Sequence, residues 1–443
     1  MKHRPSPSRR SFLAGSGAAL AGGATAGLAP GCKNVTGALA LDLAVPRSMD
    51  TLRVALIGCG GRGTGAANQA LSTSGSVELV AMADAFADRL AGSRRALLER
   101  HPEAVRVPDE QCFVGFDAYQ RAMELDVDVV ILATPPGFRP LHFEHAVALG
   151  RHVFMEKPVA VDGPGVRRVL AAAEAAKAKN LKVGVGLQRH HDVGYIETVR
   201  RIQAGQIGRL QLLRVYWNSA GVWVKPRREG MSEMQYQMRN WYYFNWLCGD
   251  HIVEQHIHNL DVGNWIMGGP PVAAQGQGGR LVRRGPEHGE IFDHHMIEYT
   301  YAGGTKMLSQ CRHMPDTWTQ VSEHAHGTLG TSHLGAASMQ TEAGSWTFEA
   351  ERPDPYQREH DNLFSAIRAD TPYNEAQRGA EATLTAIMGR MATYSGKIVK
   401  WEEALNSEID LSPEAYAWDA TPQVRPGPDG SYPVAVPGVS TVF

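Results

Sequence analysis

Several features that mark particular protein classes are scarce in this sequence. The chain has only five cysteines in 443 residues and no C-x-x-C spacing, so it predicts no disulfide framework. Its formal net charge is −2, which gives no electrostatic reason to expect nucleic acid as a partner. It also has no internal repeat. With 43% hydrophobic and 20% charged residues, the composition is that of an ordinary soluble globular protein.

A long uninterrupted hydrophobic run is missing as well. The apolar stretch 13–28 is rich in Ala and Gly, and it is too short for a good permanent membrane span. It follows Ser8-Arg9-Arg10-Ser11-Phe12-Leu13, which resembles the twin-arginine signal for export of folded proteins. Leu28-Ala29-Pro30-Gly31-Cys32 resembles a lipoprotein cleavage box, with Pro30 an imperfect fit, so lipidation at Cys32 stays open. We expect export to the periplasm, either as a free protein or as a lipoprotein facing it.

The remaining chain is long enough for two domains of ~100–200 residues each. Up to about residue 186, short apolar runs alternate with helical sequence, which predicts a parallel, doubly wound sheet. Beyond it the runs alternate in polarity, which predicts a mainly antiparallel sheet. We therefore expect a signal and linker over 1–46, an α/β Rossmann domain over 47–186, and an α+β domain over 187–443 that ends in a Pro/Gly-rich tail. The first domain should have strands at 52–57, 77–83, 127–133 and 152–155, and the second at 210–217, 296–301 and 305–311.

A glycine motif closes the first expected strand. Gly58, Gly60 and Gly63 have G-x-G-x-x-G spacing between a strand and a helix, the context in which this motif binds a dinucleotide. The first glycine permits a tight turn, the second lets the pyrophosphate approach the backbone, and the third lets the helix pack closely. Asp84 ends the second strand, ~20 residues further on, where a carboxylate accepts hydrogen bonds from the ribose 2′-hydroxyl. This favours NAD, although Arg89 nearby leaves NADP open.

Further motifs resemble those of the glucose–fructose oxidoreductase, inositol dehydrogenase and MocA family, abbreviated Gfo/Idh/MocA. They occur in the family's order and cover nearly all of the chain after the signal: the glycine motif, Ala133-Thr134-Pro135-Pro136 followed by His142, Glu156-Lys157-Pro158, and Gly205-Gln206-Ile207-Gly208. The resemblance implies a cofactor site made by Gly58, Gly60, Gly61, Arg62, Gly63, Asp84, Thr134, Pro135, His142, Glu156 and Lys157. It also implies that Lys157 lies near the nicotinamide and hydrogen-bonds the hydroxyl being oxidised.

A second group of polar residues precedes Trp265. Family members commonly have Asp, His four residues on and Asp three further; this sequence has Glu254, His258 and Asp261. In helical geometry these residues share one face. His258 is a candidate acid or base, and Glu254 or Asp261 could orient it or bind sugar hydroxyls. Since Glu reaches one methylene further than Asp, the fine geometry of the site stays in question.

The 18 histidines also raise the question of a metal. His251, His256 and His258 cluster with acids, and histidine pairs recur at 190–191 and 294–295. No run matches H-E-x-x-H or a Cys/His zinc pattern, so we predict no catalytic metal and assign most histidines to structural or surface positions.

Two reaction classes remain. The first is an NAD(P)-dependent oxidoreductase acting on a hydroxyl of a sugar, polyol or glycoside. The second is an NAD-dependent glycosidase that oxidises, eliminates, hydrates and re-reduces its substrate. A non-catalytic sugar-binding module is disfavoured by the intact glycine motif. Export of the folded protein with its cofactor bound favours a protein that holds the nicotinamide tightly and regenerates it in place. The resemblance further implies a homodimer or homotetramer.

Overall fold

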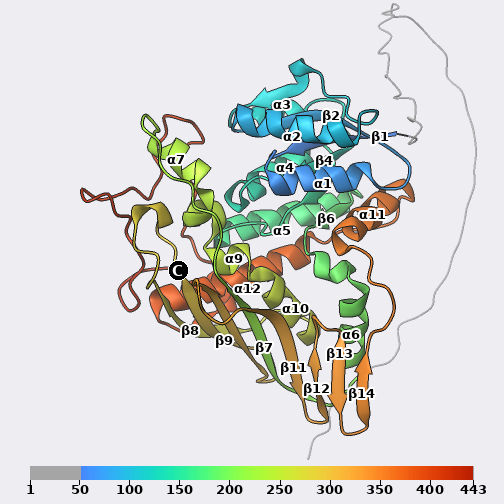
Figure 1. Cartoon of the computed structure of the whole chain (residues 1–443), viewed down its shortest axis with the longest axis vertical. Helices are drawn as coiled ribbons and strands as arrows, with labels where there is room; N and C mark the ends of the chain where they lie inside the picture. Colours follow the sequence, from blue (N-terminus) through green and yellow to red (C-terminus); the bar gives the residue numbers. More distant parts are fainter. Residues whose placement is uncertain (1–50, 443) are drawn as a thin grey trace, which may run out of the picture. The chain divides into compact units, whose positions relative to one another are not determined.

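The computed structural model describes residues 51–442, and the predicted twin-arginine signal and Cys32 lie outside this range. The first sheet has six parallel strands in the order β3-β2-β1-β4-β5-β6. Every residue of β4 is buried, because helices cover both faces of the sheet (Figure 1). The elements of this region are β1 (Thr51–Ile57), α1 (Gly61–Leu71), β2 (Ser76–Asp84), α2 (Ala87–Arg100), β3 (Cys112–Val114), α3 (Ala118–Met123), β4 (Val129–Leu132), α4 (Arg139–Ala148), β5 (His152–Met155), α5 (Gly163–Ala178) and β6 (Val183–Val185).

The second sheet has nine strands in the order β14-β13-β12-β11-β7-β10-β9-β8-β15. Its pairs are antiparallel except that β7 and β10 run parallel. The fold therefore confirms the predicted class, a Rossmann sheet with a second, mainly antiparallel one. The strands are β7 (Leu210–Ser219), β8 (Ala273–Gly279), β9 (His294–Thr300), β10 (Lys306–His313), β11 (Gln320–Gly327), β12 (Gly330–His333), β13 (Ser338–Thr341), β14 (Gly344–Thr347) and β15 (Val399–Lys400).

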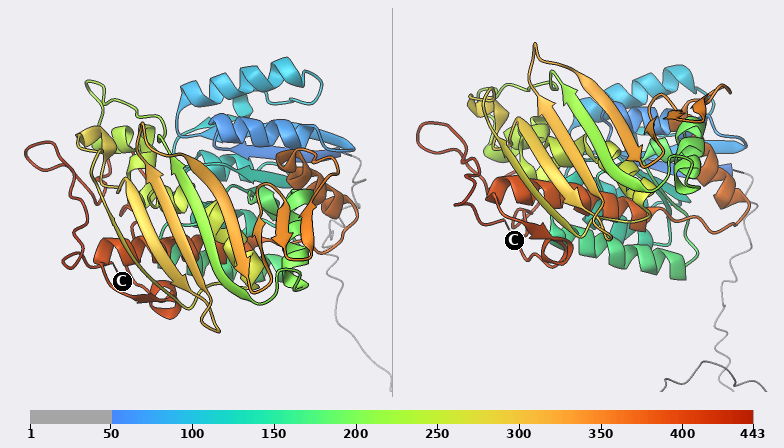
Figure 2. Two further views of the ribbon diagram at one scale, coloured as in Figure 1. Left: turned by 60° about the horizontal axis from the view of Figure 1, so that its bottom comes forward. Right: turned by 90° about the horizontal axis from the view of Figure 1, so that it is seen from below.

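Helices cover one face of this second sheet. The long α12 is buried along almost its whole length and packs against α5, α10 and β8, so it lies between the two sheets. Figure 2 shows the strands from the opposite face, over which none of the described helices lies. The helices of this region are α6 (Val193–Gln203), α7 (Glu233–Arg239), α8 (Asn245–Cys248), α9 (His251–Glu254), α10 (Ile257–Met267), α11 (Pro355–Arg368), α12 (Ala376–Ser395) and α13 (Trp401–Leu405).

The helix expected to carry Glu254, His258 and Asp261 together is interrupted. Glu254 is the last residue of α9, and His258 and Asp261 belong to α10. The carbonyl of Glu254 accepts a hydrogen bond from the ammonium of Lys157, a partner from outside the segment. The prediction of one shared helical face is therefore wrong. Among residues 51–442, no helix is both long and apolar enough to cross a membrane.

Candidate active site

A cavity of ≈ 590 Å³ lies at the carboxyl ends of β1, β2, β4 and β5, where the second region covers the Rossmann sheet. Its walls contain all of the predicted cofactor and catalytic residues except Gly63 and Asp261. We call the part lined by Gly58, Gly60, Gly61 and Asp84 the nucleotide end. The part lined by Lys157, Glu254 and His258 is the reaction end. The fold thus brings to one cavity residues that lie far apart in the sequence.

The glycine motif fixes the nucleotide end through backbone contacts. Gly58 has φ +98°, and a Cβ there would lie 2.6 Å from the carbonyl carbon of Ala133. A Cβ on Gly63 would lie 1.9 Å from the carbonyl oxygen of Gly58, which explains why Gly63 supports the loop without lining the cavity. A Cβ on Gly60 would meet no protein atom within 4 Å. Gly60 therefore leaves open space at the start of α1, where a pyrophosphate can approach the helix amides.

Asp84 also lies at the nucleotide end, where both of its carboxylate oxygens accept hydrogen bonds from the backbone. Its Oδ2 accepts the backbone N–H of Cys59 at 2.7 Å, and its Oδ1 accepts that of Phe86 at 2.8 Å. Burial raises the pKa of Asp84, while these hydrogen bonds and the charge of Arg89 act in the opposite direction. Arg89 lines the cavity beside this carboxylate. The nucleotide end therefore has an acid suited to ribose hydroxyls, with a guanidinium close by.

A buried arginine that sequence reasoning missed ties two strand ends together. Arg139 donates to the carbonyl of Thr134 at 2.6 Å and to that of Glu156 at 3.0 Å, so it joins the loops after β4 and β5. Burial lowers the pKa of Arg139 to about 10 and that of His142 to about 3. His142 is therefore neutral, and its Nδ1 lies 3.2 Å from the Thr134 hydroxyl. These residues shape the cavity wall on which Thr134 and Pro135 lie.

Arg62 and Glu156 pair with each other across the cavity wall. The Nε of Arg62 donates to Glu156 Oε1 at 2.6 Å, and the Arg62 guanidinium lies 5.1 Å from the ring centre of Tyr356. Tyr356 lies in the first turn of α11 and also lines the cavity, although sequence reasoning did not select it. The pair links the glycine loop to the strand end that precedes Lys157.

Lys157 connects the two regions of the protein at the reaction end. Its Nζ donates to the Glu254 carbonyl at 2.5 Å and lies 3.2 Å from Glu254 Oε1. The side chains of Lys157 and Glu254 are 11% and 15% exposed, so the ion pair is shielded from water but still borders the cavity. The Glu at position 254 thus meets the lysine with both its carboxylate and its carbonyl.

His258 lies in the same wall with no carboxylate partner. Burial and the nearby charges of Lys157 and Arg189 hold its pKa well below the usual range, so the ring is neutral. Its Nδ1 is buried without a hydrogen-bond partner among the described atoms. The predicted orientation of His258 by Asp261 is not what the structure has: Asp261 Oδ2 lies 2.8 Å from Nε2 of His190. The ring of His258 instead lies parallel to that of Trp217, 6.0 Å away.

Sequence reasoning also missed the support behind His258. Buried Glu323 accepts hydrogen bonds from Arg189, Asn259 and Tyr195, which come from three different elements. Arg189 is one of the two cations that hold His258 neutral. No spacing in the sequence connects these residues, because only the packing of α6 and α10 against β11 brings them together. The substrate-side wall also contains the aromatic side chains of Trp217, Trp223 and Trp241, the cation Lys225 and the amide Gln255.

The C-terminal tail, residues 406–442, packs against side chains that line the nucleotide end. The Trp418 ring centre lies 4.6 Å from that of Phe116 and 5.1 Å from that of Phe86, and both phenylalanines line the cavity. The tail is held in turn by α7, because Gln237 donates to the Val424 carbonyl at 2.8 Å and Tyr432 donates to Glu233 at 2.5 Å. Part of the chain's end therefore packs on two side chains that line the nucleotide end.

Comparison with known proteins adds family evidence. Residues 52–187 match the GFO/IDH/MocA oxidoreductase family, NAD-binding Rossmann fold, and residues 195–333 match the GFO/IDH/MocA C-terminal domain. Together the two spans cover more than half of the chain. An inositol 2-dehydrogenase of Rhizobium meliloti (strain 1021) is 26% identical over 63% of this chain and 74% of its own length. Inositol 2-dehydrogenases of Klebsiella pneumoniae are matched over 55% of their length.

Solved structures share the fold. The aldose-aldose oxidoreductase of Caulobacter crescentus, in complex with glycerol, aligns with a TM-score of 0.62 and 18% identity over 79% of this chain and 99% of its own. A levoglucosan dehydrogenase in complex with NADH and levoglucosan aligns over the same shares, with a TM-score of 0.62 and 16% identity. At these identities the likeness concerns the fold.

Proposed function

Since the chain belongs to the Gfo/Idh/MocA family of NAD-binding oxidoreductases, we propose that it moves a hydride between a tightly held nicotinamide and a hydroxyl-bearing carbon of a sugar, polyol or glycoside. The observation that carries the proposal is the single cavity with a glycine-loop end and a Lys157–Glu254–His258 end. The relatives named for inositol, aldose and levoglucosan chemistry support this substrate class.

The nucleotide end fits a dinucleotide. The space in front of Gly60, the start of α1 and the acid at Asp84 suit a pyrophosphate and a ribose. When bound, the nicotinamide supplies the hydride acceptor and donor. We favour NAD because the Asp84 carboxylate repels a 2′-phosphate, with NADP as the alternative through Arg89. Denaturing the purified protein and identifying the released nucleotide by chromatography tests this choice.

At the reaction end, Lys157 and His258 have complementary roles. The Lys157 ammonium, held by Glu254, can donate a hydrogen bond to the substrate oxygen and stabilise the negative charge that develops there. His258 is neutral and lines the cavity, so it can accept the hydroxyl proton. In the reverse direction the imidazolium returns that proton.

Retention of the cofactor is supported by the C-terminal tail. Trp418 packs on Phe86 and Phe116, which line the nucleotide end, so the tail would hold this part of the wall in place around a bound nucleotide. A retained cofactor must be returned to its starting state within the protein. It can do so by reducing a second sugar or by returning the hydride to the first substrate.

The second of these routes leads to the alternative, an NAD-dependent glycosidase. The aromatic wall of Trp217, Trp223 and Trp241 favours it, because such a surface can hold the leaving group of a glycoside next to Lys157. One assay separates the two reactions: the holoprotein is given aryl glycosides, and aglycone release and nicotinamide absorbance are followed together. Many aglycones per protein without net reduction support the glycosidase. Reduced cofactor without aglycone supports the dehydrogenase.

Export and assembly complete the proposal. The twin-arginine pathway would carry the folded holoprotein to the periplasm, with lipidation at Cys32 as the open question. Fractionation of cells, with Arg9 and Arg10 replaced by Lys as the control, tests export, and mass spectrometry of the mature N-terminus tests lipidation. A homodimer or homotetramer is supported by the helix-free face of the second sheet, where Met296 is 49% exposed. Light scattering measures the assembly.

A further inference from the structure

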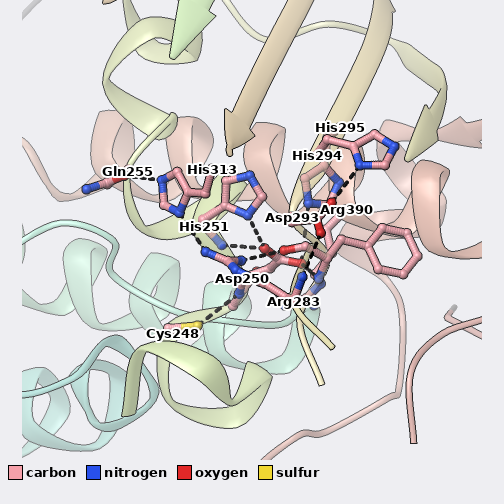
Figure 3. A network of polar contacts seen from close by, with 12 residues as sticks. Cys248, Asp250, His251, Gln255, Arg283, Asp293, His294, His295, His313 and Arg390 are labelled. Atoms are coloured by element: carbon pink, nitrogen blue, oxygen red, sulfur yellow. Dashed lines mark hydrogen bonds and ion pairs between the residues drawn. The ribbon is translucent and has the colours of Figure 1, made fainter. Parts of the chain in front are cut away.

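A cluster of buried polar groups lies behind the reaction end, outside the cavity. Asp250 stands at its centre, between α8 and α9, with its backbone at φ +75°, a conformation unusual for a residue with a side chain. His251 follows it, and His295 reaches it from β9 (Figure 3). The side chains of Asp250, His251 and His295 are all 0% exposed. This is a costly environment for an ionised carboxylate, so its neighbours must compensate the charge.

The hydrogen bonds assign the protons of the two rings. His251 Nδ1 lies 2.7 Å from Asp250 Oδ1, and when it donates to that oxygen the neutral ring has a bare Nε2. His295 Nδ1 lies 2.9 Å from Thr393 Oγ1, and that hydroxyl also lies within hydrogen-bond distance of the carbonyls of Gly389 and Arg390. When the Thr393 hydroxyl donates to one of these carbonyls, His295 donates from Nδ1, and the neutral ring has a bare Nε2.

The bare nitrogen of His295 faces a carboxylate oxygen. Its Nε2 lies 3.3 Å from Asp250 Oδ2, yet the pair does not meet hydrogen-bond geometry, and Nε2 of His251 and of His295 have no hydrogen-bond partner among the described atoms. Two lone pairs at this separation repel unless a positive centre lies between them. Two ligands of a tetrahedral Zn²⁺, each at ~2.0–2.2 Å, stand roughly 3.3–3.6 Å apart, which matches the observed spacing.

We propose that Asp250, His251 and His295 bind a divalent transition-metal ion of the Zn²⁺ class. One donor atom from each residue lies within 4.8 Å of the other two. Two imidazoles with a carboxylate are a donor set that Zn²⁺ accepts. The nearby cations Arg283 and Arg390 are engaged with the carbonyls of Phe292 and Gly249. The site was not predicted from the sequence because His295 comes from a strand far from the Asp250-His251 pair.

The position of the cluster gives the ion a structural role. Asp250 also accepts the N–H of Phe292 and the hydroxyl of Tyr394, so it ties α9 to β9 and α12. The His251 ring lies 4.4 Å from that of His313, whose Nε2 is 2.7 Å from Oε1 of Gln255, a residue of the cavity wall. An ion at Asp250 would therefore fix the segment that carries Glu254 and His258.

Metal analysis of the full-length protein tests the proposal directly. The holoprotein is purified without chelator, and its zinc, manganese, iron and cobalt contents are measured by plasma mass spectrometry. We expect about one equivalent of one of these metals per chain. Protein stripped with a chelator should rebind Zn²⁺ with a rise in Tm, and Co²⁺ in its place should give visible absorption bands typical of a site with nitrogen ligands.

Neighbouring histidines provide a matched pair of variants. His295→Gln should lose the metal, whereas His294→Gln, which changes a ring that is 40% exposed and paired with Asp293, should keep it. If His295→Gln does not fold, the metal content of the wild-type protein and its rebinding of Zn²⁺ still test the proposal. Wild-type protein that contains no metal and binds neither Zn²⁺ nor Co²⁺ after stripping overturns the proposal and leaves a buried Asp–imidazolium pair as the explanation. Equal metal in both variants overturns it too.

Discussion

The nucleotide end and the reaction end of the cavity differ in what fixes their shape. At the nucleotide end, Gly58 and Gly63 hold the loop through contacts between backbone atoms, and the C-terminal tail packs on side chains that line this end. At the reaction end, Lys157, Glu254 and His258 come from three elements and depend on one another's charges. Cofactor binding and turnover should therefore be separable, so that side-chain changes at the reaction end leave cofactor binding intact.

Removing the ammonium of Lys157 should give the largest effect. We expect Lys157→Met to lower kcat by about 10³-fold, because the developing charge on the substrate oxygen loses its stabilising partner. Cofactor content, measured after denaturation, should stay at the wild-type level. Lys157→Arg serves as the control that keeps the charge and changes its shape. Unchanged turnover in the Met variant would remove Lys157 from the mechanism.

Adding a methyl group to the glycine loop should affect the nucleotide end, through both the stability of the protein and its binding of the cofactor. In Gly63→Ala the new Cβ would overlap the Gly58 carbonyl, so we expect a stability loss of about 1–3 kcal/mol and loss of cofactor. Gly60→Ala is the matched variant, since its Cβ meets no protein atom within 4 Å. It should keep the Tm of the apoprotein and still bind less cofactor. Denaturant unfolding and nucleotide analysis measure both effects, and equal stabilities for the two variants would refute the steric argument.

Loosening the contacts of the C-terminal tail should have a smaller effect, limited to the rate at which bound nucleotide exchanges. Trp418→Ala removes the ring that packs on Phe86 and Phe116, so labelled NAD should exchange into the protein about 10-fold faster. Trp346→Ala, an aromatic change on β14 outside the cavity, is the control. The rate of a single turnover with cofactor already bound should not change. An exchange rate equal to the wild type would show that the tail does not retain the cofactor.

The smallest effect should be that of pH, because kcat/KM should change little as the pH falls through the neutral range. Because the pKa of His258 is held well below 6.5, the ring stays neutral and able to accept a proton as the pH falls through 6.5. The acid limb of kcat/KM should therefore appear only at a pH well below that value. A limb centred near 6.5 in wild-type protein would contradict the assigned environment of His258.

The two ends also differ in how well the sequence predicted them. The glycine spacing, Asp84 and β5 follow from local patterns, since strand, turn and helix are adjacent in the chain. Lys157 and His258 were selected through family resemblance, but their partners were not. The break between α9 and α10, the Asp261–His190 pair and the Arg189–Glu323 support depend on contacts between distant segments. Such contacts have no local signature, so they appear only in the folded protein.

The central claim is that the protein turns over with a nicotinamide that it keeps. The most direct measurement is the number of product molecules formed per protein, without added cofactor, after extensive dialysis of full-length protein. Substrates are a pair of aldoses, for mutual oxidation and reduction, and an aryl glycoside. We expect many turnovers per chain with at least one of these substrates. At most one product per chain, with activity appearing only when NAD is supplied, would contradict it.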